Sequence, residues 1–252
     1  MLKNWTSVFL LLLMVGLGAC SALPEELANH PAVAQQEKAN YLLLTPKDNT
    51  LQKQTGILFY PGGLVAPQAY VQPLQELAAA GYPVVIVKVT GNLAIFNVGK
   101  AAQFRNLVAV DQWVIGGHSL GGVIASYDVR DQPQAYAGLF LWASFSGEAA
   151  DLSNWQGAAL SLSAEQDGLT LAEDVEQNKA YLPSPVMVQN VAAFPSTSTT
   201  GTTIYHEIQG GNHAQFGSYG TQNGDGEASI SKGQQHSEII AFMQAFLQAN
   251  QW

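Results

Sequence analysis

Beyond residue 56, short apolar runs alternate along the chain with segments whose apolar residues recur at helical spacing. A continuous β-branched or aromatic run is typical of a strand that a parallel sheet buries on both faces. The run YPVVIVKV is the clearest case. The predicted strands are Ile57–Tyr60, Tyr82–Val89, Trp113–Gly116, Ala137–Ala143, Ala158–Ser163 and Thr203–Ile208.

Helices are predicted between these strands and near the end of the sequence. Tyr70, Leu74 and Leu77 have the spacing of one helix face, and Gly81 is placed to end that helix. Alternating strands and helices imply an α/β fold, with a mostly parallel sheet and helices on both of its faces. No linker interrupts the pattern, so residues 37–252 are predicted to form a single domain. The predicted helices are Pro67–Ala80, Ala101–Leu107, Leu120–Val129 and Ser237–Asn250.

The first 36 residues do not share this pattern and are predicted to lie outside the fold. Lys3 precedes the apolar run Val8–Leu17. As a helix this run would span roughly 15 Å, about half of the hydrocarbon core of a bilayer. A run of this length after a basic residue is typical of a signal peptide, which we assign to residues 1–19.

The sequence Leu17-Gly18-Ala19-Cys20 resembles the bacterial lipobox, in which the cysteine is diacylated and becomes the first residue of the mature chain. Cys20 is the only cysteine, and its position favours lipidation over an ordinary secretory signal with an incidental cysteine. We therefore expect an exported, membrane-anchored lipoprotein at the cell surface or in the periplasm. Residues 20–36 are predicted to form a lipidated tether in which His30 is solvated.

Composition excludes several other classes of protein. The chain has 19 acidic and 10 basic residues, a net charge of −9, which argues against binding to nucleic acid. One cysteine allows neither an internal disulfide nor a zinc site made of several cysteines. No His and carboxylate residues have metal-ligand spacing, and no glycine-rich turn continues as a phosphate-binding loop, so we expect no metal and no cofactor.

The segment Gly117-His118-Ser119-Leu120-Gly121 fits the pattern G-x-S-x-G between a predicted strand and a predicted helix. This context is that of a nucleophile elbow, a sharp turn that lifts a serine hydroxyl above the sheet. Larger side chains two residues from the serine would collide with such a turn. We therefore predict Ser119 as a nucleophile; the alternative is a glycine-rich turn that contains a serine by chance.

A serine nucleophile needs a base and an acid that orients the base, in the chain order serine, acid, histidine. Asp167 and His213 each follow a predicted strand, at the edge where open α/β sheets place their sites. The alternatives for the acid are Glu148, Glu165 and Asp225, with Glu148 foremost. The remaining histidines are assigned other roles: His118 packs in the elbow, His206 lies in a strand, and His236 is exposed near the last helix.

An acyl-transfer site also needs two backbone N–H groups that stabilise an oxyanion. The residue after the serine, Leu120, is one candidate. The second is Gly63 in the turn Pro61-Gly62-Gly63-Leu64, with Leu64 as the near alternative, because glycine allows a substrate to approach the backbone closely. A simple turn remains the other interpretation of this Pro-Gly-Gly sequence.

Taken together, these residues resemble the α/β-hydrolase superfamily. Four segments are similar to a bacterial group of little-characterised hydrolases within it, and they extend over most of the predicted domain. The resemblance implies an α/β-hydrolase core of the eight-stranded type, either complete or trimmed at its start, and a Ser119–Asp167–His213 triad. It implies no particular substrate. The segments are Phe59–Val65 (FYPGGLV), Gly91–Asn97 (GNLAIFN), Trp113–Gly122 (WVIGGHSLGG) and Gly210–Gly226 (GGNHAQFGSYGTQNGDG).

We therefore expect a carboxylesterase-like serine hydrolase that cleaves an ester or related acyl bond through an acyl-enzyme. The alternatives are an acyltransferase and a catalytically silent binding lipoprotein of the same fold. Only Ser144–Gly157 separates the fourth and fifth predicted strands, where this superfamily usually carries a cap. A minimal cap favours small or short-chain substrates. Pro183–Thr203, rich in Pro, Ser and Thr, looks longer than in the similar group and could overhang the pocket.

Overall fold

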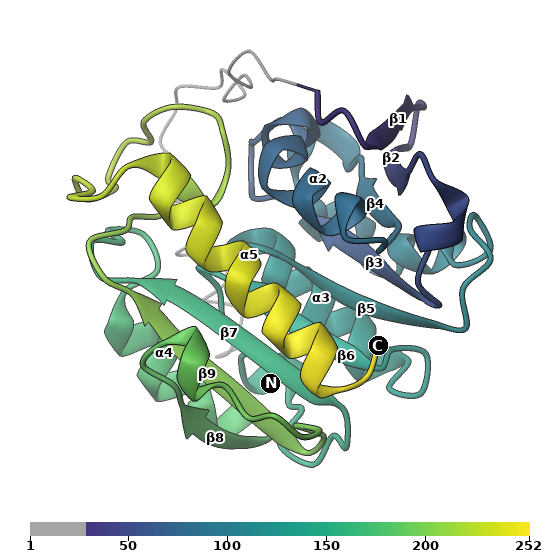
Figure 1. The fold of residues 1–252 in the computed structure, drawn as a ribbon. Coiled ribbons are helices and arrows are strands. Elements are labelled where there is room, and N and C mark those ends of the chain that lie inside the picture. Colours follow the sequence, from purple (N-terminus) through teal and green to yellow (C-terminus); the bar gives the residue numbers. More distant parts are fainter. Residues whose placement is uncertain (1–28) are drawn as a thin grey trace.

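The computed structural model describes residues 29–252 (Figure 1). The predicted signal peptide and Cys20 lie outside the described residues. Among the residues described, no helix has both the length and the apolar character needed to cross a membrane.

A nine-stranded sheet forms the centre of the domain, in the order β1-β2-β4-β3-β5-β6-β7-β9-β8. The strands β3 to β9 are parallel to their neighbours, whereas β2 pairs antiparallel with both β1 and β4. The strands are β1 (Val33–Glu37), β2 (Tyr41–Pro46), β3 (Thr55–Tyr60), β4 (Val84–Val87), β5 (Gln112–His118), β6 (Gly138–Trp142), β7 (Ala158–Ala164), β8 (Ser184–Met187) and β9 (Thr202–Ile208). The predicted α/β fold with a mostly parallel sheet is confirmed.

Helices cover both faces of the sheet, as predicted (Figure 1). The helices α2 (Val71–Ala79) and α5 (Lys232–Ala249) pack against each other and share one apolar core with the sheet. Helices α3 (Leu120–Asp131) and α4 (Ala172–Asn178) contribute to the core on the opposite face. The central strands are buried on both sides, which explains why their sequences are continuously apolar.

The start of the domain differs from the prediction, because β1 includes residues 33–36 that were assigned to the tether. Four of the five side chains in β1 are exposed, so its sequence has no strand pattern of its own. Its conformation comes from antiparallel pairing with β2, and the core is therefore not trimmed at its start. His30 is half-buried rather than solvated, and its backbone N–H donates to Oε1 of Gln75 (3.0 Å).

Other boundaries also shift. The predicted helix at 101–107 is a short 3₁₀ turn, Lys100–Phe104. Helix α5 begins five residues earlier than predicted, because Ser231 and Gln234 form a capping box at its start. The extra turn packs His236 inside the protein, so the prediction that this residue is exposed is wrong.

The segment 183–203, which was expected to be a long connection that could overhang the pocket, contains the edge strand β8, which pairs with β9. All four side chains of β8 are exposed, which is why the strand was not apparent from its sequence. Between β6 and β7, residues 143–157 contain a single 3₁₀ turn, Glu148–Ala150, and no α-helix. The cap at this position is therefore minimal.

Candidate active site

Ser119 lies in the sharp turn between β5 and α3 and adopts φ +52° and ψ −124°. A positive φ is strained for a residue with a side chain, and such strain is concentrated at functional sites. The two glycines of the motif permit this turn. A Cβ at Gly117 would lie 2.5 Å from both the carbonyl oxygen of Tyr60 and the carbonyl carbon of Gly121, and a Cβ at Gly121 would overlap the same Tyr60 oxygen.

The backbone of the elbow is held by three hydrogen bonds to one carbonyl. The oxygen of Ser119 accepts from the N–H of Gly122 (3.0 Å), from the N–H of Val123 (3.3 Å) and from the hydroxyl of Ser144 (2.7 Å). Ser144 follows β6, so it ties the elbow to the neighbouring strand. The residue Ser119 itself is only half-buried, which leaves it accessible from the carboxyl edge of the sheet.

Asp167 and His213 meet at the same edge, because the loops that carry them follow the adjacent strands β7 and β9. Nδ1 of His213 and Oδ2 of Asp167 are 2.8 Å apart, and both side chains are buried. The other carboxylate oxygen of Asp167 accepts from the backbone N–H groups of Leu169 (2.8 Å) and Thr170 (2.7 Å). With the carboxylate at Nδ1, a neutral imidazole carries its proton there and keeps the lone pair of Nε2 for accepting a proton.

His118 packs beside this pair, and the centroids of the His118 and His213 rings are 4.4 Å apart. Nδ1 of His118 lies 2.8 Å from the hydroxyl of Tyr70, which accepts from the N–H of Gly62 (3.0 Å). Burial, reinforced by the nearby His213, lowers the pKa of His118 well below its usual value. His118 is therefore a neutral packing residue that connects the elbow, through Tyr70, to the turn after β3.

The other candidates for the acid and the base, all within the described chain, form no hydrogen bond with the side chains of this pair. Glu148 is exposed in the 3₁₀ turn after β6. Glu165 accepts from the N–H of Gly210 (2.8 Å). Asp225 accepts from the backbone N–H of His213, not from its ring. The ring of His206 bonds to the carbonyl of Val188 (2.8 Å) and to Glu238 (2.6 Å). Asp167 and His213 are thus the acid and base candidates that the fold brings together.

The turn after β3 faces the start of α3. A Cβ at Gly63 would contact the side chain of Leu120, the first residue of that helix (3.4 Å). Within residues 29–252, the N–H groups on either side of Gly63 are engaged, since Gly62 donates to Tyr70 and Leu64 to the oxygen of Asn92 (2.7 Å). The N–H of Gly63 has no such bond, and the N–H of Leu120, at a helix start, has no partner within the helix. This difference favours Gly63 over Leu64 as an oxyanion donor.

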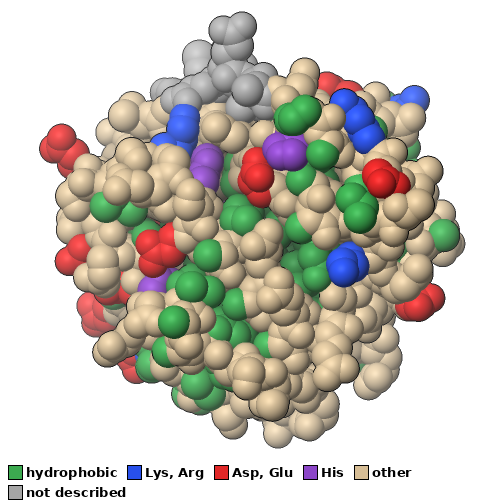
Figure 2. Space-filling model, viewed as in Figure 1, with side chains coloured by type: hydrophobic (Ala, Val, Ile, Leu, Met, Phe, Trp, Pro, Cys, Tyr) green, Lys and Arg blue, Asp and Glu red, His purple; other side chains and the backbone are tan. Residues whose placement is uncertain are grey.

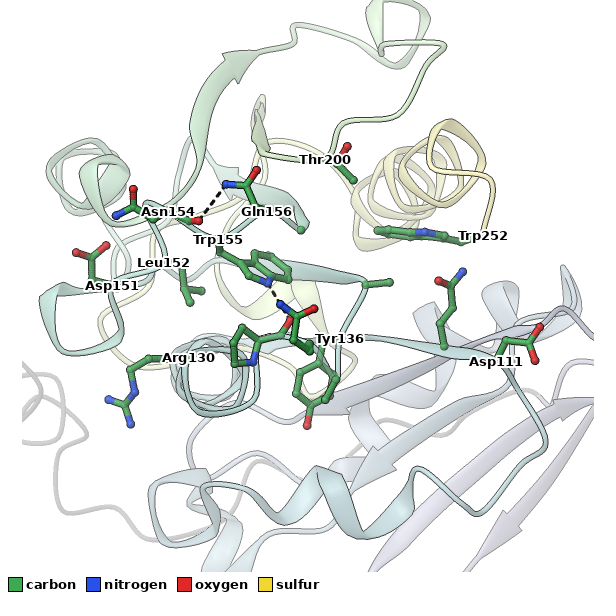
Figure 3. Close-up of a pocket in the computed structure, with 16 residues that line it drawn as sticks. Asp111, Arg130, Tyr136, Asp151, Leu152, Asn154, Trp155, Gln156, Thr200 and Trp252 are labelled. Atoms are coloured by element: carbon green, nitrogen blue, oxygen red, sulfur yellow. Dashed lines mark hydrogen bonds between the residues drawn. The ribbon is translucent and has the colours of Figure 1, made fainter.

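A groove of about 770 Å³ lies at the opposite edge of the sheet (Figure 3). Gln112, Ala137 and Gly157, at the amino ends of β5, β6 and β7, line it, with Trp155 near its centre and Trp252 at one side. Parallel sheets place their sites at the carboxyl edge, so this groove is not the candidate site. A groove of about 420 Å³ follows the loop after His213, from Asn212 to Ala228.

Potential metal ligands are not grouped in the described part of the chain, where no three His, Cys, Asp or Glu side chains come together. Ser144, Tyr70 and Thr170 were not predicted as site residues. Their hydroxyl groups form hydrogen bonds with backbone atoms of other elements. The hydroxyl of Thr170, for example, donates to the oxygen of Ala143 (3.0 Å). No local sequence pattern signals such contacts.

Comparisons with known proteins agree with this architecture. One solved structure that matches comes from a structural analysis of two fungal esterases from Rhizomucor miehei. It has a TM-score of 0.55 and 16% sequence identity, and the match covers 87% of this chain and 84% of the other. No curated protein sequence matches the chain. Residues 56–237, most of the chain, match the alpha/beta hydrolase family. The protein therefore belongs to the alpha/beta hydrolase family.

Proposed function

We propose that the protein is a serine hydrolase that cleaves an ester or related acyl bond through Ser119, His213 and Asp167. The observation that carries the proposal is the buried hydrogen bond of 2.8 Å between Asp167 and His213. It lies at the edge of the sheet where the strained elbow presents Ser119. A fold that only binds a ligand has no need of a strained serine and an oriented imidazole at the same edge of its sheet.

In this mechanism the hydroxyl oxygen of Ser119 attacks the acyl carbon, while Nε2 of His213 takes the hydroxyl proton. Asp167 keeps the proton on Nδ1 and stabilises the imidazolium. The backbone N–H groups of Gly63 and Leu120 stabilise the oxyanion. His213 then gives its proton to the leaving alcohol, and an acyl ester remains on Ser119. A water molecule, deprotonated by the same imidazole, releases the acid and restores the serine.

Small or short-chain acyl esters are the substrates that we propose. The support is the segment between β6 and β7, which forms one 3₁₀ turn and no helical cap. A series of p-nitrophenyl esters of increasing chain length tests this, with kcat/KM expected to be highest for the shortest acyl groups. Preference for long-chain, emulsified triglyceride would contradict it.

We also propose that Cys20 is lipidated and anchors the mature protein to a membrane after export. The support is the sequence Leu17-Gly18-Ala19-Cys20 after the apolar run. Two or more acyl chains give stable anchoring, whereas one gives only marginal binding. Mass spectrometry of the mature N-terminus decides the matter, because an unmodified start at any other residue excludes the anchor.

Labelling with a fluorophosphonate, which reacts with activated serines, tests the proposed reaction. The wild-type protein should be labelled and should hydrolyse p-nitrophenyl acetate. Ser119→Ala should abolish both and leave the melting temperature nearly unchanged, because a smaller side chain adds no strain to the elbow. Ser153→Ala, which removes an exposed serine elsewhere, is the control. Full turnover by Ser119→Ala would refute the proposal and favour the binding lipoprotein. Transfer of the acyl group from Ser119 to an alcohol rather than to water would identify an acyltransferase.

A further inference from the structure

Asp225 lies twelve residues beyond His213, in the loop that returns beneath the candidate site. Its carboxylate accepts four backbone N–H groups. Oδ1 accepts from Gly226 (2.9 Å), His213 (3.1 Å) and Gly168 (3.3 Å), and Oδ2 accepts from Ala214 (2.8 Å). The carboxylate therefore faces inward onto the backbone.

These four donors belong to both loops of the candidate acid and base. Gly168 follows Asp167 directly, and His213 is itself one of the donors. Asp225 thus connects the backbone beside the acid to the backbone of the base, whose side chains share the 2.8 Å bond. It adds to the direct backbone bond between the two loops, from the N–H of Gln166 to the oxygen of Gly211 (2.8 Å).

The packing around Asp225 is too close for larger residues. A Cβ at Gly168 would overlap the carbonyl oxygen of Gly224, and a Cβ at Gly226 would overlap that of Gln166. The amide of Asn212 donates to the carbonyl of Gly226 (2.8 Å) and closes the contact on the other side. The two loops therefore lie against each other along their backbones, with Asp225 between them.

We propose that Asp225 is a positioning residue, which holds the His213 and Asp167 loops in register so that their side chains form the hydrogen bond needed for catalysis. The inference rests on the proposed hydrolase function. A displacement of about 1 Å at a catalytic group can lower the rate by about 10²-fold. Without the carboxylate, four N–H groups lose their acceptor, and the loops lose the contact that joins Gly168 to His213 and Ala214. All of these contacts are made to backbone N–H groups.

Three variants test this role. Asp225→Ala removes all four acceptor contacts, and we expect kcat on p-nitrophenyl acetate to fall by about 10²-fold with KM nearly unchanged. Asp225→Asn keeps one oxygen where Oδ1 accepts three bonds but turns an N–H donor toward Ala214, so its kcat should be intermediate. Glu227→Gln is the matched control, because it removes a carboxylate from an exposed position in the same loop.

A second readout does not depend on turnover. The His213 Nδ1–H bonded to Asp167 should give a far-downfield proton resonance in the wild type and in Glu227→Gln. We expect the resonance to be lost in Asp225→Ala and shifted in Asp225→Asn. The asparagine variant keeps the test valid if the alanine variant does not fold. Unchanged resonance and kcat in both Asp225 variants would overturn the proposal. Loss of the resonance in a protein that hydrolyses no ester would support the positioning role and refute the hydrolase.

Discussion

Asp128 is a buried carboxyl group that should make the stability of the protein depend on pH in an unusual direction. It lies in α3, where it accepts from the hydroxyl of Tyr60 (2.8 Å) and from the N–H of Gly99. Burial raises the pKa of Asp128 from 3.8 to about 6, and these hydrogen bonds only partly oppose the rise. Ionised Asp128 is therefore less stable in the folded protein than in water.

The size of the effect follows from the pKa difference between the folded and unfolded chain. The difference corresponds to about 3 kcal/mol of unfolding free energy. Below about pH 4, Asp128 is protonated in both states and the penalty is absent. As the pH rises from about 4 to about 6, only the unfolded chain ionises readily, so the folded state loses stability. Above about pH 6 the full penalty applies.

Asp128→Asn replaces the carboxyl by a group that stays neutral. The hydroxyl of Tyr60 lies 3.2 Å from the oxygen of Asn97, so it can donate there and accept from the new amide. Unfolding free energies from urea titrations at pH 4 and pH 7 should show that the variant gains up to about 3 kcal/mol over the wild type at the higher pH. Asp111→Asn, at an exposed position outside this helix, separates burial from loss of one charge. The reasoning would be refuted if the difference in unfolding free energy between the wild type and Asp128→Asn were the same at both pH values.

Two further substitutions test the candidate site. Asp167→Asn should lower kcat by about 10⁴-fold, because the wrong imidazole tautomer then faces the serine. Glu148→Gln should leave kcat unchanged, and a large loss in Glu148→Gln with little loss in Asp167→Asn, in steady-state assays, would mean that Glu148 is the acid. Tyr70→Phe leaves the N–H of Gly62 and Nδ1 of His118 without a partner and should cost about 1–3 kcal/mol of unfolding free energy in urea. Tyr136→Phe is its control, since that buried hydroxyl has no hydrogen-bond partner within residues 29–252, and a similar loss there would contradict the assignment.

The surface of the described domain carries both charged and exposed apolar side chains. The face shown in Figure 2 carries acidic and basic side chains that are separated by uncharged ones. Exposed apolar side chains include Phe96 in a 3₁₀ turn, Leu171 in a loop, and the consecutive residues Val186 and Met187 in the edge strand β8.

Features that depend on neighbouring residues in the chain were evident from the sequence. The elbow is one, because its glycines and serine lie within five residues and the turn between them is sterically restricted. The central strands are another, since burial on both faces requires continuous apolar runs. The mostly parallel α/β fold and the approximate positions of α2, α3 and α5 followed from these local patterns.

The edges of the domain were decided by tertiary structure alone. β1 and β8 are exposed strands whose conformation comes from pairing with β2 and β9, so their sequences have no recognisable pattern. His236 is buried because a capping box extends α5 toward its N-terminus. For the two strands, a partner distant in the chain supplies the stabilising contact, whereas the capping box of α5 joins residues three positions apart.

The same is true of the finer geometry of the candidate site. The sequence placed several carboxylates after strands, and only the adjacency of β7 and β9 brings Asp167 rather than Glu148 to His213. The sequence favoured Gly63 over Leu64 as an oxyanion donor, and the structure adds a physical reason, because the N–H of Leu64 donates to the oxygen of Asn92. Asp225 meets the Asp167 loop 57 residues away through backbone N–H groups. Every residue except proline carries such an N–H, so no side-chain pattern could have identified these partners.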